Sequence, residues 1–218
     1  MNLNLCCVPL TVLAVSVASA ATAEVELSIY SGKQGAPDSQ FEGDYPGGGS
    51  FDRDVSWNGK SFSAPPYYGV RGTWWQDSGL GFGAEFTHSK VYLDGSDQDA
   101  LGFDDFQLTD GLNVITANAM YRWQNAAGPV TPYVGAGLGF TLPHVDAEVG
   151  GEKTYGYQFG GPAMRLMAGA SYDVTERVAV FGEYQFTASR NDLDLDGGGD
   201  VQTDITTNAV NVGVSLKF

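Results

Sequence analysis

The sequence predicts an all-β fold, an eight-stranded antiparallel transmembrane β-barrel with four long external loops. Three observations predict it. The last residues, Asn211–Phe218, alternate polar and apolar with a period of two and end on an aromatic residue. The chain holds thirty glycines and 12% aromatic residues, as expected of many strands joined by turns. Short turns and long connections alternate along it. Strands with one apolar and one polar face, connected in this way, are typical of membrane barrels.

The N-terminal segment, residues 1–23, is predicted to be a secretory signal peptide. Leu10–Ala23 is apolar or small throughout, and the first charged residue is Glu24. Two A-x-A cleavage sites occur, at residues 18–20 and 21–23, and the sequence does not decide between them. The first seven residues lack the usual basic residue, but the apolar run is shorter than the ~20 residues of a membrane-spanning helix. We therefore expect one mature barrel domain, residues 24–218.

Charge and cysteine content exclude several functions. The formal net charge of −15 lies entirely within residues 24–218, and such a chain is not expected to bind nucleic acid, whose phosphates are also negative. Both cysteines, Cys6 and Cys7, lie in the predicted signal peptide. The mature domain therefore offers no disulfide, zinc-thiolate site or cysteine nucleophile.

Eight strands follow in order, each with period-two alternation. They are expected at about residues 25–33, 67–75, 80–91, 112–123, 132–142, 155–172, 178–189 and 206–218. The long segments, near residues 34–66, 92–111, 143–154 and 190–205, are acidic and are expected to be external loops. Aromatic residues gather at strand ends, where they suit the two interfacial girdles of a membrane protein. They include Tyr67, Tyr68, Trp74, Trp75, Tyr121, Trp123, Tyr133, Tyr155 and Tyr172.

The residues expected to face the barrel interior carry nearly balanced charge. Eight strands enclose a lumen that side chains fill, and unpaired buried charge is costly, so a salt-bridge network is expected there. Catalysis by Glu85 or Glu183 is the alternative. The inward set is Glu26, Arg71, Glu85, Arg122, Arg165, Glu183 and Lys217.

The last long segment contains Asp192, Asp194 and Asp196 at the opening spacing of a calcium loop. The twelfth position is Thr203 rather than Glu, which excludes an EF-hand. The three carboxylates are a candidate cation site that would bridge lipid phosphates. Simple solvation of the acids is the alternative.

Two histidines, His88 and His144, are the only ones in the chain, and both fall at external strand ends. An imidazole there can act as a base or bind a metal, and two solvated rim residues are the alternative. We predict His88, His144 and Glu85 as catalytic candidates. Asp146 and Glu148 are the candidate metal ligands near them, and a divalent metal ion is the candidate cofactor.

Several segments resemble the small eight-stranded outer-membrane barrels of the OmpA/OmpX type. They are PYVGAGLGF at 132–140, MAGASYDVTERVAVFGEYQF at 167–186 and the C-terminal strand. The resemblance implies a monomer in the outer membrane of a Gram-negative bacterium, with its loops at the cell surface. Lipid and lipopolysaccharide would be its surroundings. The resemblance also implies recognition by the barrel-assembly machinery through Asn211, Gly213, Leu216 and Phe218.

Other segments, several of them in the long connections, resemble outer-membrane lipid A oxidases. They are EVELSIYSG at 24–32, EGDYPGGGSFD at 42–52, PPYYGVRGTWW at 65–75, GFGAEFTHSKVY at 81–92, FTLPHVD at 140–146 and LDGGGDVQTDI at 195–205. This resemblance implies oxidation of the proximal glucosamine of lipid A to an aminogluconate unit, with oxygen as co-substrate. It carries no assignment of catalytic residues. A non-enzymatic envelope barrel and a lipid A acylase or deacylase are the alternatives.

Overall fold

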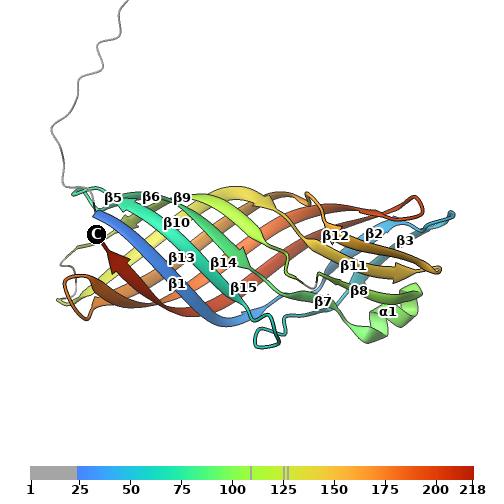
Figure 1. Ribbon diagram of the computed structural model, residues 1–218, viewed down its shortest axis with the longest axis horizontal. Coiled ribbons are helices and arrows are strands. Elements are labelled where there is room, and N and C mark those ends of the chain that lie inside the picture. The colour runs from blue at the N-terminus through green and yellow to red at the C-terminus, as the bar shows by residue number, and fades with distance from the viewer. Residues whose placement is uncertain (1–23, 109, 125, 127) are drawn as a thin grey trace, which may run out of the picture.

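Eight antiparallel strands close into a barrel in the computed structural model, which describes residues 24–108, 110–124, 126 and 128–218. The predicted signal peptide lies outside these residues. The strands pair in chain order, and the first pairs with the last to close the wall (Figure 1). The barrel strands are β1 (Glu24–Gly35), β5 (Tyr68–Trp75), β6 (Leu80–His88), β9 (Val114–Arg122), β10 (Val130–Thr141), β13 (Gly161–Asp173), β14 (Val178–Leu195) and β15 (Gly199–Lys217).

The outer wall is apolar along its whole circumference. Alternate residues of each strand point outward, so a band of large aliphatic side chains is exposed, among them Ile29, Leu138, Leu166, Val210 and Val212. Such a band is the surface that a barrel presents to lipid. No helix among the described residues is long and apolar enough to cross a membrane.

Three aromatic residues expected in the interfacial girdles face the other way. Tyr67, Trp75 and Tyr133 are buried and belong to the cluster of side chains inside the barrel. Tyr67 and Trp75 are direct neighbours of the outward-facing Tyr68 and Trp74, and successive strand residues point to opposite faces. The girdle assignment was therefore wrong for these three residues.

The barrel interior holds the predicted salt-bridge network. Arg71 Nη1 lies 3.0 Å from Glu183 Oε2 and 3.6 Å from Glu85 Oε2, and Arg165 Nη1 lies 2.9 Å from Glu85 Oε1. All four side chains are buried. The four side chains alternate in charge along this network, so the formal charges within the network sum to zero. The remaining predicted members lie near the short-turn end, where Arg122 pairs with Glu24 and Glu26, and Lys217 with Asp173.

The four long connections, predicted as external loops, fold into further β-structure beyond the barrel. We call residues 36–67, 89–113, 142–160 and 190–205 the extension. Its elements are β2 (Ser39–Asp44), β3 (Ser50–Val55), β4 (Trp57–Asn58), β7 (Val91–Leu93), α1 (Gly95–Leu101), β8 (Phe103–Leu108), β11 (His144–Val149), β12 (Glu152–Tyr157) and the outer ends of β14 and β15.

The extension builds on the barrel at one end (Figure 1). The hairpin of β2 and β3 adds to the outer part of β15, and β12, β11, β8, β7 and β4 form a five-stranded sheet of their own. The predicted loop 190–205 is a continuation of the β14–β15 hairpin. The predicted sixth strand, residues 155–172, is divided between β12 and β13. The short helix α1 was not expected.

Alternation with a period of two explains why the acidic connections are ordered. Asp192 and Asp194 are exposed, whereas Leu193 and Leu195 between them are buried in a common core. Phe41, which is fully buried, lies at the centre of an aromatic cluster, with Phe106 edge-on at 4.8 Å and Phe51 stacked at 5.3 Å. The core reaches Val114 and Ala163 at the barrel rim, so barrel and extension are packed together.

Candidate functional site at the barrel rim

The two histidines contact one short segment, Asp110–Asn113, where barrel and extension meet. His88 ends β6, and its Nδ1 lies 3.1 Å from Asn113 Oδ1. His144 begins β11, and its backbone N–H donates to the carbonyl of Gly111 at 3.1 Å. Its Nε2 lies 3.9 Å from Asp110 Oδ2. The structure thus brings both predicted histidines, each only 4% exposed, to the same four residues.

Asn113 determines which nitrogen of His88 carries the proton. Its Nδ2 donates to three carbonyls, those of Asp110 at 2.8 Å and of Gly111 and Leu142 at 3.2 Å each. These acceptors orient the amide so that Oδ1 faces His88. Because an amide oxygen only accepts, Nδ1 of the neutral imidazole is the donor, and the lone pair is on Nε2. His88 Nε2 is buried and has no hydrogen-bond partner, so its lone pair is unused in the folded protein.

The His88 ring is fixed from two sides. Tyr68, its register partner on β5, stacks on it with ring centroids 5.3 Å apart and planes 24° apart. On the other side is Gly111, whose φ of 92° lies in the left-handed region that favours glycine. A Cβ at this position would lie 2.5 Å from His88 Nδ1. The segment can therefore close over the ring only with glycine at residue 111.

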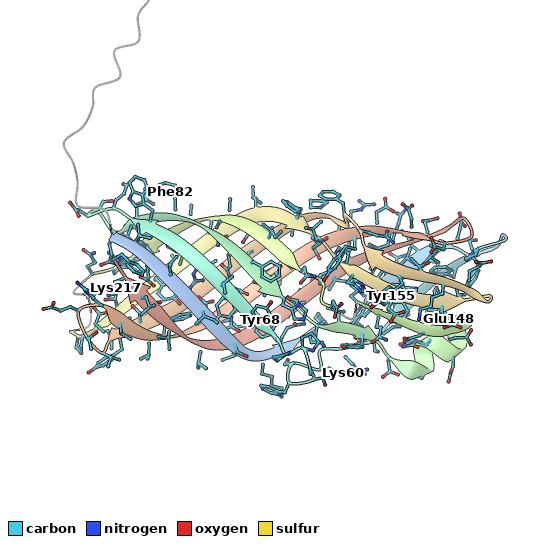
Figure 2. All side chains as sticks on the ribbon, in the orientation of Figure 1. Lys60, Tyr68, Phe82, Glu148, Tyr155 and Lys217 are labelled. Carbon is cyan, nitrogen blue, oxygen red and sulfur yellow. The ribbon has the colours of Figure 1, made fainter. Side chains whose placement is uncertain are left out.

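His144 lies in an aromatic setting on the outer face of β11 and β12. The rings of Tyr155 and Tyr157 meet it edge-on, with centroids 4.6 and 4.7 Å away. Both tyrosines are about two-thirds exposed, at 64% and 65%. The His144 Nδ1 has no hydrogen-bond partner. Figure 2 shows Tyr68 and Tyr155 where barrel and extension meet, while Phe82 and Lys217 lie toward the other end.

The carboxylates predicted as metal ligands do not gather around the two histidines, although Asp146 follows His144 on the same face of β11. Asp146 pairs with Lys153 at 3.3 Å, and Glu148 lies further out on β11. Asp192 and Asp194 lie on the exposed face of β14, where residues i and i+2 are about 6.8 Å apart, and Asp196 follows the strand end. Within the described ranges, no group of three or more His, Cys, Asp or Glu side chains is arranged to hold a metal ion.

Glu85 does not join the histidines. It points into the lumen, whereas His88 points outward from the same strand, so the barrel wall separates them. Its carboxylate is engaged by Arg71, Arg165, Tyr30, Asn118 and Gln185. This arrangement favours the structural role over the catalytic one for Glu85.

The residues of the predicted assembly signal face both sides of the wall. Asn211 is fully buried in the lumen, with Nδ2 3.4 Å from Glu183 Oε1, and Gly213 faces the same way. Leu216 and Phe218 are exposed on the outside. The spacing of polar and apolar residues in the predicted assembly signal is therefore also explained by the inward and outward faces of β15, the strand that closes the barrel.

Sequence reasoning missed Asn113, Gly111 and Tyr68 as members of the site. The dipeptide Asp110–Gly111 signals a turn, but not a turn that folds back on a histidine. The contacts of Asn113 with Leu142 and His88 join three segments of the chain, and a local pattern carries no information about them.

Comparison with known proteins agrees with this architecture. Residues 8–218 match the family model described as outer membrane protein beta-barrel domain. The solid-state NMR structure of the outer membrane protein AlkL in DMPC lipid bilayers is 15% identical, covering 100% of this chain and 97% of that one, with a TM-score of 0.55. The crystal structure of Neisserial surface protein A (NspA) is 19% identical, covering 90% and 97%, with a TM-score of 0.50. At such identities the likeness shows the fold alone. No curated protein matches the chain.

Proposed function

The chain belongs to the outer membrane protein β-barrel family, and from that premise we propose that it is an enzyme that oxidises lipid A in the outer leaflet. One observation carries the proposal. His88, at the barrel rim, is held by Asn113 in the tautomer whose Nε2 lone pair has no hydrogen-bond partner. Support for the substrate comes from the sequence resemblance, because the segments at 65–75, 81–92 and 140–146 contribute Tyr68, His88 and His144 to this rim.

The proposed reaction oxidises C1 of the proximal glucosamine in its free hemiacetal form. His88 Nε2 takes the proton of the C1 hydroxyl, which makes C1 a stronger electron donor. The C1–H bond breaks, and its hydrogen and electron pair pass to molecular oxygen, which is reduced to hydrogen peroxide with one further proton. C1 becomes a lactone carbonyl, and water opens the lactone to the aminogluconate. The product has gained one oxygen atom.

A divalent metal ion was the candidate cofactor for this reaction. His88 and His144 offer two ring nitrogens, whereas a catalytic metal site ordinarily has three protein ligands. The described residues gather no such set, so they do not fit a resident metal ion, and no step is assigned to one. The aromatic faces of Tyr68, Tyr155 and Tyr157 would instead orient the sugar.

A non-enzymatic envelope barrel is the second candidate function. The observation that favours it is the packed core of the extension, which joins all four long connections into one ordered unit. Such a unit would reinforce the envelope or present a stable surface without chemistry.

Mass spectrometry of lipid A separates the two functions. Aerated cells producing the wild-type protein should yield lipid A heavier by one oxygen atom, and His88→Ala should abolish the gain. Phe159→Ala is the matched control, because Phe159 is an exposed ring that packs on Phe140. All variants must keep the gel mobility shift between unheated and boiled protein.

Each remaining outcome has a clear meaning. Unchanged lipid A in wild-type cells would support the envelope barrel. Loss or gain of an acyl chain would instead support the acylase or deacylase alternative. Full oxidation by His88→Ala would refute the role of His88 as base.

A further inference from the structure

The membrane-facing wall carries a diagonal ridge of large apolar side chains. The residues are register partners on successive strands, so they follow the hydrogen-bond direction across the sheet. The ridge begins near the short-turn end of β13 and rises toward the rim at β6. Its members are Tyr172, Val180, Val214, Ile29, Val70 and Phe86.

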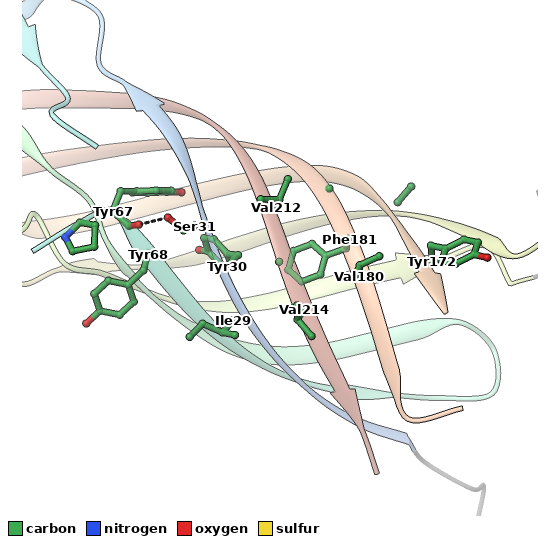
Figure 3. Close-up of a pocket in the computed structure, with 14 residues that line it drawn as sticks. Ile29, Tyr30, Ser31, Tyr67, Tyr68, Tyr172, Val180, Phe181, Val212 and Val214 are labelled. Atoms are coloured by element: carbon green, nitrogen blue, oxygen red, sulfur yellow. Dashed lines mark hydrogen bonds between the residues drawn. The ribbon is translucent and has the colours of Figure 1, made fainter. Parts of the chain in front are cut away.

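A groove runs beside this ridge and ends at Tyr68, the residue whose ring stacks on His88. Its row of register partners is Ala170, Gly182, Val212, Ser31, Tyr68 and His88. Small residues at 170, 182 and 31 form the floor, and the groove has a volume of about 750 Å³. Figure 3 shows it between Tyr68 and Tyr172. From β5 to β13 it crosses four strand intervals, about 19 Å at 4.8 Å each. We call it the rim groove.

A second groove lies on the other side of the ridge and serves as an internal comparison. Its volume is about 720 Å³, and it shares Ile29 and Val214 with the rim groove. Gly72 and Ala84 are register partners along it. His88 lines neither groove, but Tyr68, which stacks on His88, lines only the rim groove. We call it the wall groove.

We propose that the rim groove binds an acyl chain of lipid A and so brings the sugar to His88. The inference rests on the proposed function and deepens it. The molecules that meet this wall are lipids, and the groove descends from the rim into the membrane as an outer-leaflet acyl chain does. Apolar surfaces have no hydrophobic drive to associate within lipid, so close packing must supply the affinity. Glycine and alanine on the floor allow that close approach.

Filling the floor of the groove tests the proposal. A Cβ at Gly182 would have Asn211 O, 3.9 Å away, as its nearest neighbour, so Gly182→Leu projects into the groove without a clash. Gly72→Leu makes the same change in the wall groove, where the nearest atom is Leu27 Cδ2 at 3.4 Å. Both substitutions add an apolar side chain on the lipid face, which a barrel tolerates.

The measurement is the occupancy of purified protein by lipid A in detergent, determined by native mass spectrometry. Losing about ten carbon–carbon contacts weakens binding about tenfold, which is the loss expected for Gly182→Leu. Gly72→Leu should match the wild type. Ala170→Leu, on the same floor, replaces Gly182→Leu if that variant loses heat-modifiability.

Two results would overturn the proposal. One is equal occupancy of the Gly182→Leu and Gly72→Leu variants. The other is retention of phosphatidylethanolamine as strongly as lipid A, which would make the groove a general lipid surface. His88→Ala separates docking from catalysis, because it should retain lipid A while losing oxidation. Selective binding without any oxidation by the wild type would refute the proposed function and leave the docking site intact.

Discussion

Arg71→Met should destabilise the barrel strongly, because Arg71 joins two buried carboxylates. Its guanidinium lies 3.0 Å from Glu183 and 3.6 Å from Glu85. Arg165 still pairs with Glu85 at 2.9 Å, so Glu183 is the carboxylate left without a cation. Breaking a buried pair from one side costs about 3–5 kcal/mol. Tyr133 donates a 2.8 Å hydrogen bond to Glu183, so we expect the lower end, about 3 kcal/mol.

The barrel offers a matched control near its short-turn end, at Arg122. Arg122 pairs with Glu24 at 2.6 Å, but the Glu24 side chain is 32% exposed. A pair that reaches solvent contributes at most about 1 kcal/mol, so Arg122→Met should change stability little. The double variant Arg71→Met/Glu183→Leu removes both buried charges and should recover most of the loss, since an apolar replacement of a buried pair is often neutral.

Urea unfolding in lipid vesicles measures these differences, with the folded fraction read from gel mobility. A loss of about 3 kcal/mol lowers the folding equilibrium constant roughly 100-fold. The reasoning fails if Arg71→Met costs no more than Arg122→Met, or if the double variant is less stable than Arg71→Met alone.

Three further predictions concern the site, the extension and the chain end. Asn113→Ala removes the hydrogen bond that fixes the His88 tautomer, so the initial rate of lipid A oxidation should fall. The fall should be smaller than the roughly 10²–10⁴-fold effect of losing a general base. An unchanged rate would refute the tautomer argument. Hydrogen bonds from the side chain of Ser96, then from Asn58 and the Ser96 amide, hold the pKa of Asp94 below its usual range. Asp94 is the N-cap of α1, so its carboxylate stabilises the start of this helix. That stabilisation is present above the unfolded pKa of about 3.9 and is lost as the pH falls through the lower folded value. Proteolysis at α1 should therefore begin only below about pH 4, and Asp94→Asn should remove this pH dependence. Deleting Phe218 should lower the yield in the outer membrane, because the assembly machinery is expected to read this residue; normal yield would contradict that reading.

The barrel was predictable because its information is local and periodic. Ile29 and Val70, or Val180 and Val214, occupy outward positions that follow directly from alternation within each strand. The structure of the extension was not predictable in this way, because acidic residues dominate its composition. Asp192 and Asp194 suggested a cation loop, whereas the intervening Leu193 and Leu195 are the residues that determine the structure by packing in the core.

The candidate site was predictable only in part. His88 and His144 stood out because the chain has no other histidine, and in the order β6, β9, β10 only β9 separates the strand that His88 ends from the strand that precedes His144. The role of Asn113 depends on carbonyls at residues 110, 111 and 142, which meet only in the folded protein. The groove likewise depends on the register of five strands, and period-two alternation does not specify register between strands.

The first two strands, β1 and β2, both pair with β15, at two separate places along it. β1 pairs with residues 208–217 of β15, and β2 pairs with residues 200–203 of the same strand. Because β15 follows every other described element in the chain, neither contact can form before β15 has been synthesised. A nascent chain truncated anywhere before β15 would present the free edges of β1 and β2 to other chains, and exposed edges promote aggregation. Insertion should therefore be an all-or-none event, in which one strand completes both the wall and the surface structure.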